Sequence, residues 1–226
     1  MNDRAVALIP AFNEAEGIAE VVQQTLPYVR EVVVVDDGSA DDTSAVARAA
    51  GAIVLRHDVN RGKGAAIITG LNHFRESPAT FAVILDADGQ HDPGEIPDFI
   101  ATAEKTGAGI VIGSRMHDTR TMPALHLWAN HFMSWVTGKL ARQVIPDSQC
   151  GYRLLARAVL PDLKLVTARF DTETEMLIHV GRAGHLIASQ PIRTIYKQGR
   201  VSRIHPCRDG VRFFKLVAKY WPTRGA

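Results

Sequence analysis

Short apolar runs alternate with helix-like stretches through the first half of this chain. The apolar runs occupy residues 5–9, 31–35, 53–56, 81–85 and 109–113, and the helical patterns occupy residues 14–26, 41–50, 63–74 and 94–106. The run at 31–35 has almost no polar relief, as expected for a strand that is covered on both faces of a sheet. Strands that alternate with helices indicate βαβ units, so we predict an α/β fold with a mostly parallel sheet. A length of 226 residues suits one such domain with a full core.

The sequence gives no sign of a membrane span or of a disulfide-linked, secreted protein. It contains no run of 18 apolar residues, and the N-terminus enters a strand without the apolar segment of a signal peptide. Two cysteines, Cys150 and Cys207, cannot supply a disulfide framework or a Cys-rich zinc site. We therefore expect a cytoplasmic protein.

Charge is distributed unevenly along the chain. Residues 191–226 hold nine Lys or Arg and one Asp, a net charge of +8, whereas the whole chain carries only +2. A basic C-terminal segment behind an acidic body suggests an anionic partner, which could be lipid, a phosphorylated substrate or nucleic acid. An ordinary solvated basic helix remains the alternative.

An acidic motif, Asp86-Ala87-Asp88-Gly89-Gln90, directly follows the apolar run 81–85. Two carboxylates at the end of a strand can converge on a hard cation such as Mg²⁺ or Mn²⁺, which prefers oxygen ligands and shares them with phosphates. Open α/β sheets bind their ligands at this carboxyl edge. The motif thus predicts a metal–diphosphate site, although Asp-Gly also suits a surface turn.

Polar motifs also follow the other expected strands. In the segment after the first strand, Asn13 is suited to cap the next helix, while Asp36 and Asp37 end the second strand. The segment 60–66 is basic and glycine-rich and opens a helix, so it is a candidate phosphate cradle that includes Lys63. It lacks the spacing of a P-loop and of a Rossmann fingerprint. Arg115, behind the fifth strand, places a guanidinium at the same edge.

Together these motifs resemble, in order, those of the family 2 glycosyltransferases, and within that family the dolichol-phosphate mannosyltransferase and polyprenyl-phosphate glycosyltransferase branch. The resemblance rests on Pro10-Ala11-Phe12-Asn13-Glu14, Asp36-Asp37-Gly38-Ser39, Asn60-Arg61-Gly62-Lys63-Gly64, Asp86-Ala87-Asp88-Gly89-Gln90, Gly113-Ser114-Arg115, Asp147-Ser148-Gln149-Cys150-Gly151-Tyr152-Arg153, Phe170-Asp171-Thr172-Glu173 and Arg200-Val201-Ser202-Arg203. It covers nearly the whole chain. It implies a GT-A fold and transfer with inversion of the anomeric centre.

The resemblance also implies roles for individual residues. The nucleotide-sugar pocket would be formed by Pro10, Phe12, Glu14, Val35, Asp37, Lys63, Asp86, Ala87, Arg115, Lys197, Arg200 and Arg203. The divalent cation would be held by Asp86, Asp88 and Gln90, and the catalytic groups would be Asp88, Arg115, Asp147, Arg153 and Arg203. The family often has Arg at position 197 and Lys or His at position 203, so these two departures leave the acceptor open.

The chemistry of the acceptor decides whether a base is needed. A phosphate monoester dianion is already a nucleophile, whereas a hydroxyl acceptor requires a general base. Asp147 is the candidate for such a base, and a role as a turn or cap residue is the equal alternative.

Two amphipathic helices are expected, over residues 122–145 and 208–221. The first carries Trp128, Phe132 and Trp135 at helical spacing, and the second pairs a basic face with an aromatic one. Such helices suit docking on anionic lipid, but packing against the core explains an aromatic stripe equally well.

We expect a metal-dependent glycosyltransferase that moves a sugar from a GDP- or UDP-sugar to a polyprenyl phosphate at the cytoplasmic face of the membrane. The expected organisation is a nucleotide-sugar half (1–115), an acceptor half (116–207) and a basic tail (208–226). A hydroxyl acceptor, a nucleotidyltransferase and a non-catalytic nucleotide-sugar binder are the alternatives. Nucleic acid is not expected as a partner, because the basic residues are interleaved with a wide apolar face. An oligomer is possible on the family pattern.

Overall fold

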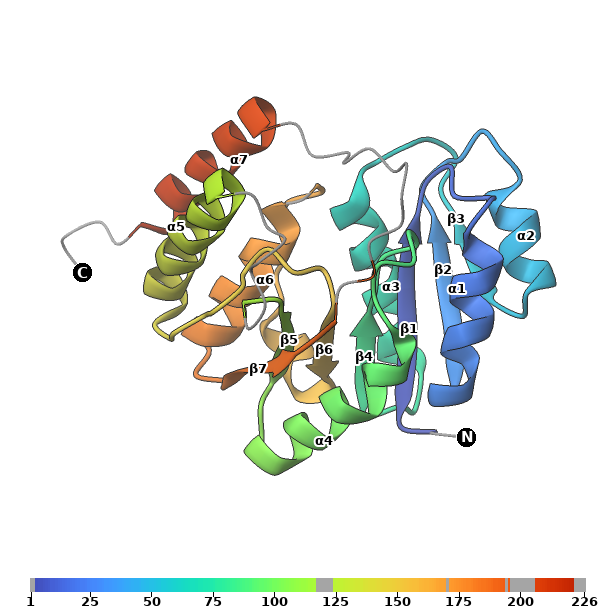
Figure 1. The fold of residues 1–226 in the computed structure, drawn as a ribbon, viewed down its shortest axis with the longest axis horizontal. Coiled ribbons are helices and arrows are strands. Elements are labelled where there is room, and N and C mark those ends of the chain that lie inside the picture. Colours follow the sequence, from blue (N-terminus) through green and yellow to red (C-terminus); the bar gives the residue numbers. More distant parts are fainter. Residues whose placement is uncertain (1–2, 117–123, 170, 194, 196–205, 222–226) are drawn as a thin grey trace.

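The computed structural model describes residues 3–116, 124–169, 171–193, 195 and 206–221. Within them the chain forms a seven-stranded sheet with helices on both faces (Figure 1). The strands are β1 (Ala5–Ala11), β2 (Glu31–Asp36), β3 (Ile53–Arg56), β4 (Phe81–Ile84), β5 (Ile110–Ser114), β6 (Arg153–Ala156) and β7 (Ile187–Pro191). Their spatial order is β3-β2-β1-β4-β6-β5-β7, and β6 runs antiparallel to both of its neighbours.

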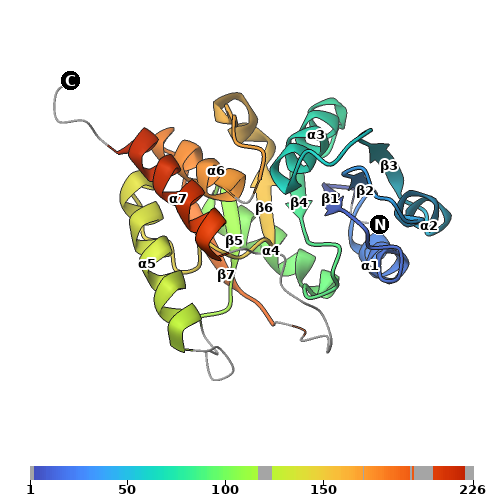
Figure 2. The same ribbon diagram turned by 90° about the horizontal axis from the view of Figure 1, so that it is seen from above.

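The helices form a layer on each face of this sheet and an outer layer at one end. They are α1 (Ile18–Thr25), α2 (Thr43–Ala49), α3 (Lys63–Glu76), α4 (Ile96–Thr106), α5 (Ala124–Ala141), α6 (Asp171–Arg182) and α7 (Pro206–Tyr220), with short 3₁₀ turns η1 (Leu26–Tyr28), η2 (Pro93–Glu95) and η3 (Arg157–Asp162). Helices α3 and α6 lie on one face, and α1 and α4 lie on the other (Figure 2). Helix α5 packs on α6, and α7 packs on both of them.

The predicted α/β fold and mostly parallel sheet are confirmed, because β1 pairs in parallel with β2 and β4, and β2 pairs in parallel with β3. The central strands are apolar for the reason expected: Val33 and Val34 on β2 are fully buried between the two helical layers. Fully burying a side chain of this size contributes about 1.5–3 kcal/mol. None of the helices that the structure describes is both long enough and apolar enough to cross a bilayer.

Helix α1 starts later than the sequence predicts. Asn13 has a positive φ of 51° and does not cap the helix, whose N-cap is Gly17. The Asn13 carboxamide instead accepts a hydrogen bond from the N–H of Ala40, 27 residues away. It therefore ties the loop after β1 to the loop after β2, and the cap prediction for Asn13 is wrong.

The second half of the chain contains the elements that the sequence pattern did not reveal. Strands β6 and β7 are only four and five residues long, and β6 completes the sheet between β4 and β5. Neither strand has the apolar run that marks the strands of the first half, because β6 begins with Arg153 and β7 contains Ser189 and Gln190. The insertion brings residues 147–153 to the sheet edge where β4 and β5 end.

Candidate active site

The polar motifs meet at the carboxyl edge of the sheet, the upper edge in Figure 1. Strands β1 and β2 end side by side, with Ala11 paired to Asp36. Strand β4 lies on the other side of β1 and leads directly into Asp86. The parallel arrangement therefore gathers the first, second and fourth strand motifs at one edge, as predicted.

Lys63 is bound at this edge between two carboxylates from different parts of the chain. Its Nζ lies 2.5 Å from Oδ1 of Asp86 and 3.2 Å from Oε1 of Glu173. Burial disfavours the charged ammonium, but the two carboxylates outweigh burial and raise the pKa of Lys63. In the same way, burial raises the pKa of Asp86, but the attraction of Lys63 is stronger, and the net shift of that pKa is downward. Lys63 and Asp86 are therefore both charged at neutral pH.

Gly151 leaves the space that this cluster occupies. A Cβ at position 151 would lie 2.7 Å from Oδ2 of Asp86 and 3.1 Å from Nζ of Lys63. The backbone of the acceptor-side motif thus passes in direct contact with the charged groups. Any residue larger than glycine would displace one of them.

The acidic motif forms a tight turn after β4. Oδ1 of Asp88 accepts a hydrogen bond from the N–H of Gln90 at 3.0 Å, and Ala87 is buried below the turn. Within the described residues, no three His, Cys, Asp or Glu side chains converge to hold a metal ion alone. Two carboxylates fit a Mg²⁺ or Mn²⁺ ion whose other ligands are diphosphate oxygens and water, because such ions usually use one or two protein carboxylates. The donor set of Asp86, Asp88 and Gln90 fits the expected ion in that shared form.

Two aromatic residues anchor the acidic turn: His91, which the sequence analysis missed, and Tyr152, which it placed in the acceptor-side motif without a role of its own. Nδ1 of His91 accepts a hydrogen bond from the N–H of Asp86 at 3.2 Å, and the His91 ring stacks on Tyr152 with 5.0 Å between centroids. The Tyr152 hydroxyl donates to the backbone carbonyl of Asp92 at 3.0 Å. The turn is thereby fixed to the residues that precede β6. The only sequence signal was the position of His91 next to the motif.

Arg115 forms a bidentate ion pair with the Asp147 carboxylate. Its Nε lies 2.8 Å from Oδ2 and its Nη2 lies 3.0 Å from Oδ1 of the carboxylate. Asp147 is only 1% exposed and also accepts hydrogen bonds from the Asn130 amide and the Gln149 N–H. Burial raises the pKa of Asp147, but the hydrogen bonds and charge of Arg115 outweigh it and hold that pKa below its usual value. The geometry favours a role in holding Arg115 over a role as general base.

Arg153 is 1% exposed and cannot reach a substrate in this structure. Its guanidinium donates to the carbonyls of Cys150 and Ser148 at 2.8 and 2.7 Å, and also to the carbonyl of Glu173. Arg153 thus joins the acceptor-side loop to helix α6. We correct its expected catalytic role to that of a positioning residue.

Three backbone N–H groups in and next to the glycine-rich segment 60–64 already have acceptors within the protein. The N–H groups of Arg61 and Gly62 donate to the Asp37 carboxylate at 2.9 and 2.7 Å, and the N–H of Ala65 donates to the carbonyl of Ala168 at 3.1 Å. The phosphate-cradle interpretation is therefore wrong for these backbone groups. Gly62 and Gly64 are needed because Ala168, Arg169 and Thr172 lie against them: a Cβ at position 64 would overlap the hydroxyl of Thr172. Of the predicted cradle, the Lys63 side chain remains at the edge.

The other predicted donor-binding residues lie around this centre with differing access. Pro10, Phe12 and Glu14 are partly exposed at the end of β1, whereas the Val35 and Asp37 side chains are 1% and 3% exposed. Asp37 also bonds to His57 Nδ1 at 2.7 Å. Lys197, Arg200 and Arg203 fall outside the described residues.

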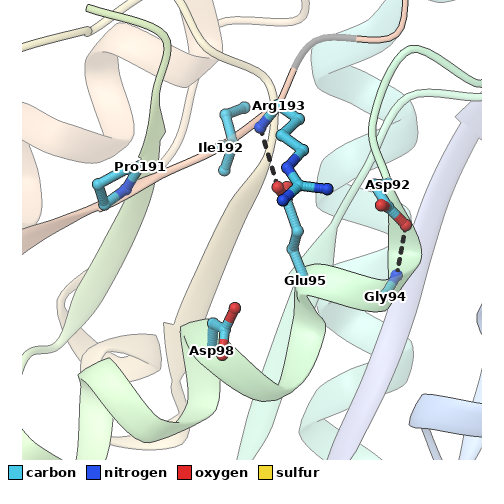
Figure 3. Close-up of a pocket in the computed structure, with 7 residues that line it drawn as sticks. All are labelled: Asp92, Gly94, Glu95, Asp98, Pro191, Ile192 and Arg193. Carbon is cyan, nitrogen blue, oxygen red and sulfur yellow. Dashed lines mark hydrogen bonds between the residues drawn. The ribbon is translucent and has the colours of Figure 1, made fainter. Parts of the chain in front are cut away.

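The chain that leads to those three residues borders the acidic turn. The N–H of Ile195 donates to the carbonyl of Gln90 at 3.1 Å, and the N–H of Arg193 donates to the Glu95 carboxylate at 2.9 Å. A hollow of about 450 Å³ opens between this segment and the start of α4 (Figure 3). Arg193 and Ile195 thus lie beside the turn that carries the predicted diphosphate site.

Helices α5 and α7 present aromatic side chains on their outer surface. Trp128 and Trp135 on α5 are 65% and 58% exposed, and Phe214 on α7 is 58% exposed. The Phe132 ring contacts two of these rings: its centroid lies 5.7 Å from that of Trp128 and 6.5 Å from that of Phe214. We call Trp128, Phe132, Trp135 and Phe214 the outer aromatic surface. Other apolar residues of the same two helices, Val136, Phe213 and Leu216, are buried. Each of the expected amphipathic helices therefore buries some of its apolar side chains and exposes others.

A family model for glycosyl transferase family 2 matches residues 6–162. The chain belongs to glycosyl transferase family 2. The match begins in β1 and includes every predicted motif through Arg153, whereas Glu173, Arg193 and Ile195 lie beyond its end.

Curated relatives of this family 2 glycosyltransferase match over nearly its full length. It is 33% identical to an uncharacterized protein of Methanocaldococcus jannaschii, over 95% of this chain and 91% of that one. It is 31% identical to the UDP-N-acetylglucosamine–dolichyl-phosphate N-acetylglucosaminyltransferase of Methanococcus voltae, over 95% of both chains. The undecaprenyl-phosphate 4-deoxy-4-formamido-L-arabinose transferase of Pseudomonas fluorescens is 27% identical, over 72% of this chain and 50% of that one. Together with the dolichyl-phosphate enzyme, it supports the polyprenyl-phosphate branch of the family.

Solved structures confirm the predicted GT-A architecture. The glucosyl-3-phosphoglycerate synthase of Mycobacterium tuberculosis superposes with a TM-score of 0.73 and 21% identity, covering 99% of this chain and 83% of that one. The same enzyme in complex with Mn²⁺, UDP and phosphoglyceric acid gives a TM-score of 0.70 and 21% identity, over 99% and 81% of the two chains. At this identity the likeness establishes the fold.

Proposed function

We propose that this glycosyltransferase moves a sugar from a nucleoside diphosphate sugar to a polyprenyl phosphate at a membrane surface. The acceptor phosphate oxygen attacks the anomeric carbon, and the bond from that carbon to the donor diphosphate breaks on the opposite side. The electron pair leaves with the nucleoside diphosphate, so the anomeric centre inverts. The products are a glycosyl polyprenyl phosphate and the free nucleoside diphosphate.

The donor side of this proposal rests on the charged groups around Asp86. A divalent ion held by Asp86, Asp88 and Gln90 would neutralise the diphosphate that departs. Lys63 supplies a cation at the same place, only 2.5 Å from Asp86. Fixed positive charge beside a developing anion is the type of stabilisation that usually contributes most to such reactions. The structures of Mycobacterium tuberculosis glucosyl-3-phosphoglycerate synthase with Mn²⁺ and UDP-glucose support a uridine donor.

The proposed phosphate acceptor is supported by the hydrogen bonds that already occupy the Asp147 carboxylate. The hydrogen bonds described above already engage both of its oxygens, and its pKa is lowered, so it is poorly placed to remove a proton from a hydroxyl. A phosphate monoester is already ionised and needs no such base. This observation favours a phosphate acceptor over a hydroxyl acceptor, and it carries the proposal. The names of two relatives, which act on dolichyl phosphate and undecaprenyl phosphate, agree with it.

The outer aromatic surface provides the membrane contact in this proposal. Exposed Trp and Phe side chains partition into the lipid interface, and basic residues beside them are attracted to anionic lipid. Lys139 on α5 and Lys215 on α7 are exposed on these two helices. Residues 1–115 would then bind the donor, 116–207 the acceptor, and 208–226 would contact lipid from the cytoplasmic side.

A two-stage experiment tests the function. Thermal unfolding is measured with UDP, GDP and their sugars, with and without Mn²⁺, because a ligand that binds the folded state raises its stability. Turnover is then measured with the best donor and either a polyprenyl monophosphate or the matching polyprenol. We expect stabilisation that requires Mn²⁺ and transfer to the phosphate only. Equal transfer to the polyprenol would contradict the phosphate acceptor.

A further inference from the structure

Asn130 is the neutral residue that completes the environment of the Arg115–Asp147 ion pair. It lies on helix α5, is only 6% exposed, and its Nδ2 donates to Oδ1 of Asp147 at 2.9 Å. Arg115 engages the same carboxylate through Nε and Nη2. Asn130 and Arg115 thus approach one carboxylate from two different elements, the α5 helix and the end of β5.

The orientation of the Asn130 amide is fixed by a second hydrogen bond. Its Oδ1 accepts from the hydroxyl of Ser134 at 3.0 Å, one turn further along α5. That hydroxyl oxygen in turn accepts from the N–H of Ser148 at 2.8 Å. The amide oxygen faces Ser134, so the amide nitrogen must face Asp147. The chain Ser148–Ser134–Asn130–Asp147 therefore closes on the loop that carries the carboxylate.

This network restricts the carboxylate in a way that the ion pair alone does not. Without Asn130, the carboxylate would keep the contacts to Arg115 and the hydrogen bond from the N–H of Gln149 at 3.2 Å. Gln149 lies two residues along the same loop as Asp147, so it would move with that carboxylate. The hydrogen bond from Asn130 fixes one oxygen to a helix that is packed against α6. The orientation of the Arg115 guanidinium at the sheet edge therefore depends on α5.

We propose that Asn130 is a positioning residue that sets the orientation of Arg115 through Asp147. The proposal rests on the proposed function only in its kinetic consequence, because the orientation of Arg115 exists without substrate. Asn130 itself touches no reacting atom. When its amide is removed, Arg115 should lose its fixed direction and the transfer step should slow.

The first test observes Arg115 directly and needs no substrate. The Nε–H of Arg115 is held 2.8 Å from a carboxylate oxygen, so it should give a distinct, slowly exchanging NMR signal, assigned by its loss in Arg115→Lys. In Asn130→Ala we expect this signal to shift and broaden. Thr137→Val is the matched control, because Thr137 is equally buried on α5 but its hydroxyl donates only to the carbonyl of Met133 among the contacts described for it. If the signal is the same in Asn130→Ala and the wild type, the proposal is overturned.

The second test measures kinetics with the best donor and a polyprenyl monophosphate. Asn130→Ala should lower kcat about tenfold and leave the affinity for UDP with Mn²⁺ within about twofold. In an Arg115→Lys background the same change should cost little more, because groups that act as a unit are not additive. Full additivity of the two losses would show that Asn130 acts independently of Arg115 and would overturn the proposal.

Two further results keep the inference testable. Should Asn130→Ala fail to fold, Ser134→Ala removes only the hydroxyl that orients the amide, and the Arg115 signal should then shift partway. An unshifted signal in a folded Ser134→Ala protein would again contradict the proposal. Absence of any wild-type turnover would count against the proposed function alone, because the NMR result stands without it.

Discussion

Lys63 and Asp86 face each other at the sheet edge with 2.5 Å between Nζ and Oδ1, although 22 residues separate them in the chain. Lys63 opens helix α3 and Asp86 follows strand β4, so the pair joins two βα units. Glu173 from α6 shares the ammonium. The carboxyl edge of the sheet and helix α6 are thereby joined through one cation.

We predict that Gly151→Ala weakens nucleotide binding. The new Cβ would lie 2.7 Å from Asp86 Oδ2 and 3.1 Å from Lys63 Nζ, so one of these groups must move. The affinity for UDP with Mn²⁺, measured by isothermal titration, should fall at least tenfold, or about 1.4 kcal/mol. Gly210→Ala is the control, because a Cβ there meets no atom within 4 Å. Equal affinities for the two variants would contradict the crowded site.

We predict that Asp88→Ala abolishes metal-dependent donor binding without unfolding the protein. Asp88 lies on an edge turn, and its one described hydrogen bond is to the N–H of Gln90 two residues ahead. Its loss should cost little stability but should remove a carboxylate from the proposed cation site. Titration of UDP with and without Mn²⁺ should then give the same weak affinity. If Mn²⁺ raises the UDP affinity of Asp88→Ala as much as that of the wild type, the ion does not bind at Asp88.

We predict that Asp147→Asn lowers kcat at every pH without removing a limb of the pH profile. Asp147 holds Arg115 by two hydrogen bonds, and its lowered pKa keeps it ionised across the working range. A neutral amide cannot match both guanidinium donors, so Arg115 should lose its direction. Loss of the acidic limb of kcat/KM in this variant would instead identify Asp147 as a general base.

The edge motifs could be predicted from the sequence because each follows a continuous apolar strand. Asp86 and Asp88 follow β4, which pairs in parallel with β1, and Arg115 follows β5. The antiparallel strand β6 between β4 and β5 leaves those two strands running in the same direction, so their ends lie at one edge. The acceptors of the backbone N–H groups could not be predicted in this way. The N–H groups of Arg61 and Gly62 donate to the Asp37 carboxylate, although from the sequence alone a phosphate was an equally good acceptor. A local pattern does not reveal a partner that is distant in the sequence.

The acceptor half was harder to predict for the same reason. Arg153 has the charge of a catalytic group, but its guanidinium is buried on three carbonyls that only the folded chain assembles. Asn130 lies in an aromatic helix pattern and gave no signal of its hydrogen bond to Asp147, 17 residues later. Trp128 and Trp135 fitted either lipid or core packing, and only their exposure separates the two.

We predict that acid weakens the docking of α7 through Glu175. This fully buried carboxylate accepts hydrogen bonds from the N–H groups of Val166 and Thr167 and from the Tyr220 hydroxyl, and pairs with Lys219 at 3.1 Å. Burial raises its pKa, but these bonds outweigh burial and lower the pKa to about 2.

A lowered carboxyl pKa stabilises the fold above the unfolded value near 4.5, and this contribution is lost as the pH falls from 4.5 toward 2. The full effect is about 3 kcal/mol, because the pKa falls from 4.5 to about 2. Urea unfolding between pH 7 and pH 3 should show a steep loss in the wild type and a flatter curve in Glu175→Gln. The exposed Glu20→Gln should follow the wild type; identical slopes in all three proteins would contradict the role of Glu175.

We predict that the outer aromatic surface binds anionic membranes. Deleting residues 208–226 would be an unsuitable test, because Phe213 and Leu216 are buried against Val136 and Ile178 and the deletion would expose that cluster. The double change Trp128→Ser and Trp135→Ser removes only exposed rings. Sedimentation with phosphatidylglycerol vesicles should then show at least a tenfold loss of binding, whereas Leu186→Ser, at the amino end of β7, should bind as the wild type does.

The charge contribution can be separated from the aromatic one. Lys215→Gln removes an exposed charge beside Phe214, and a basic residue at an anionic surface contributes about 1 kcal/mol, roughly a fivefold change in affinity. That loss should shrink in high salt, because the interaction is screened, while the loss from the tryptophan changes should persist. Vesicle binding that is unaffected by both sets of changes would mean that α5 and α7 do not contact lipid, and the acceptor would then have to reach Arg115 from solution.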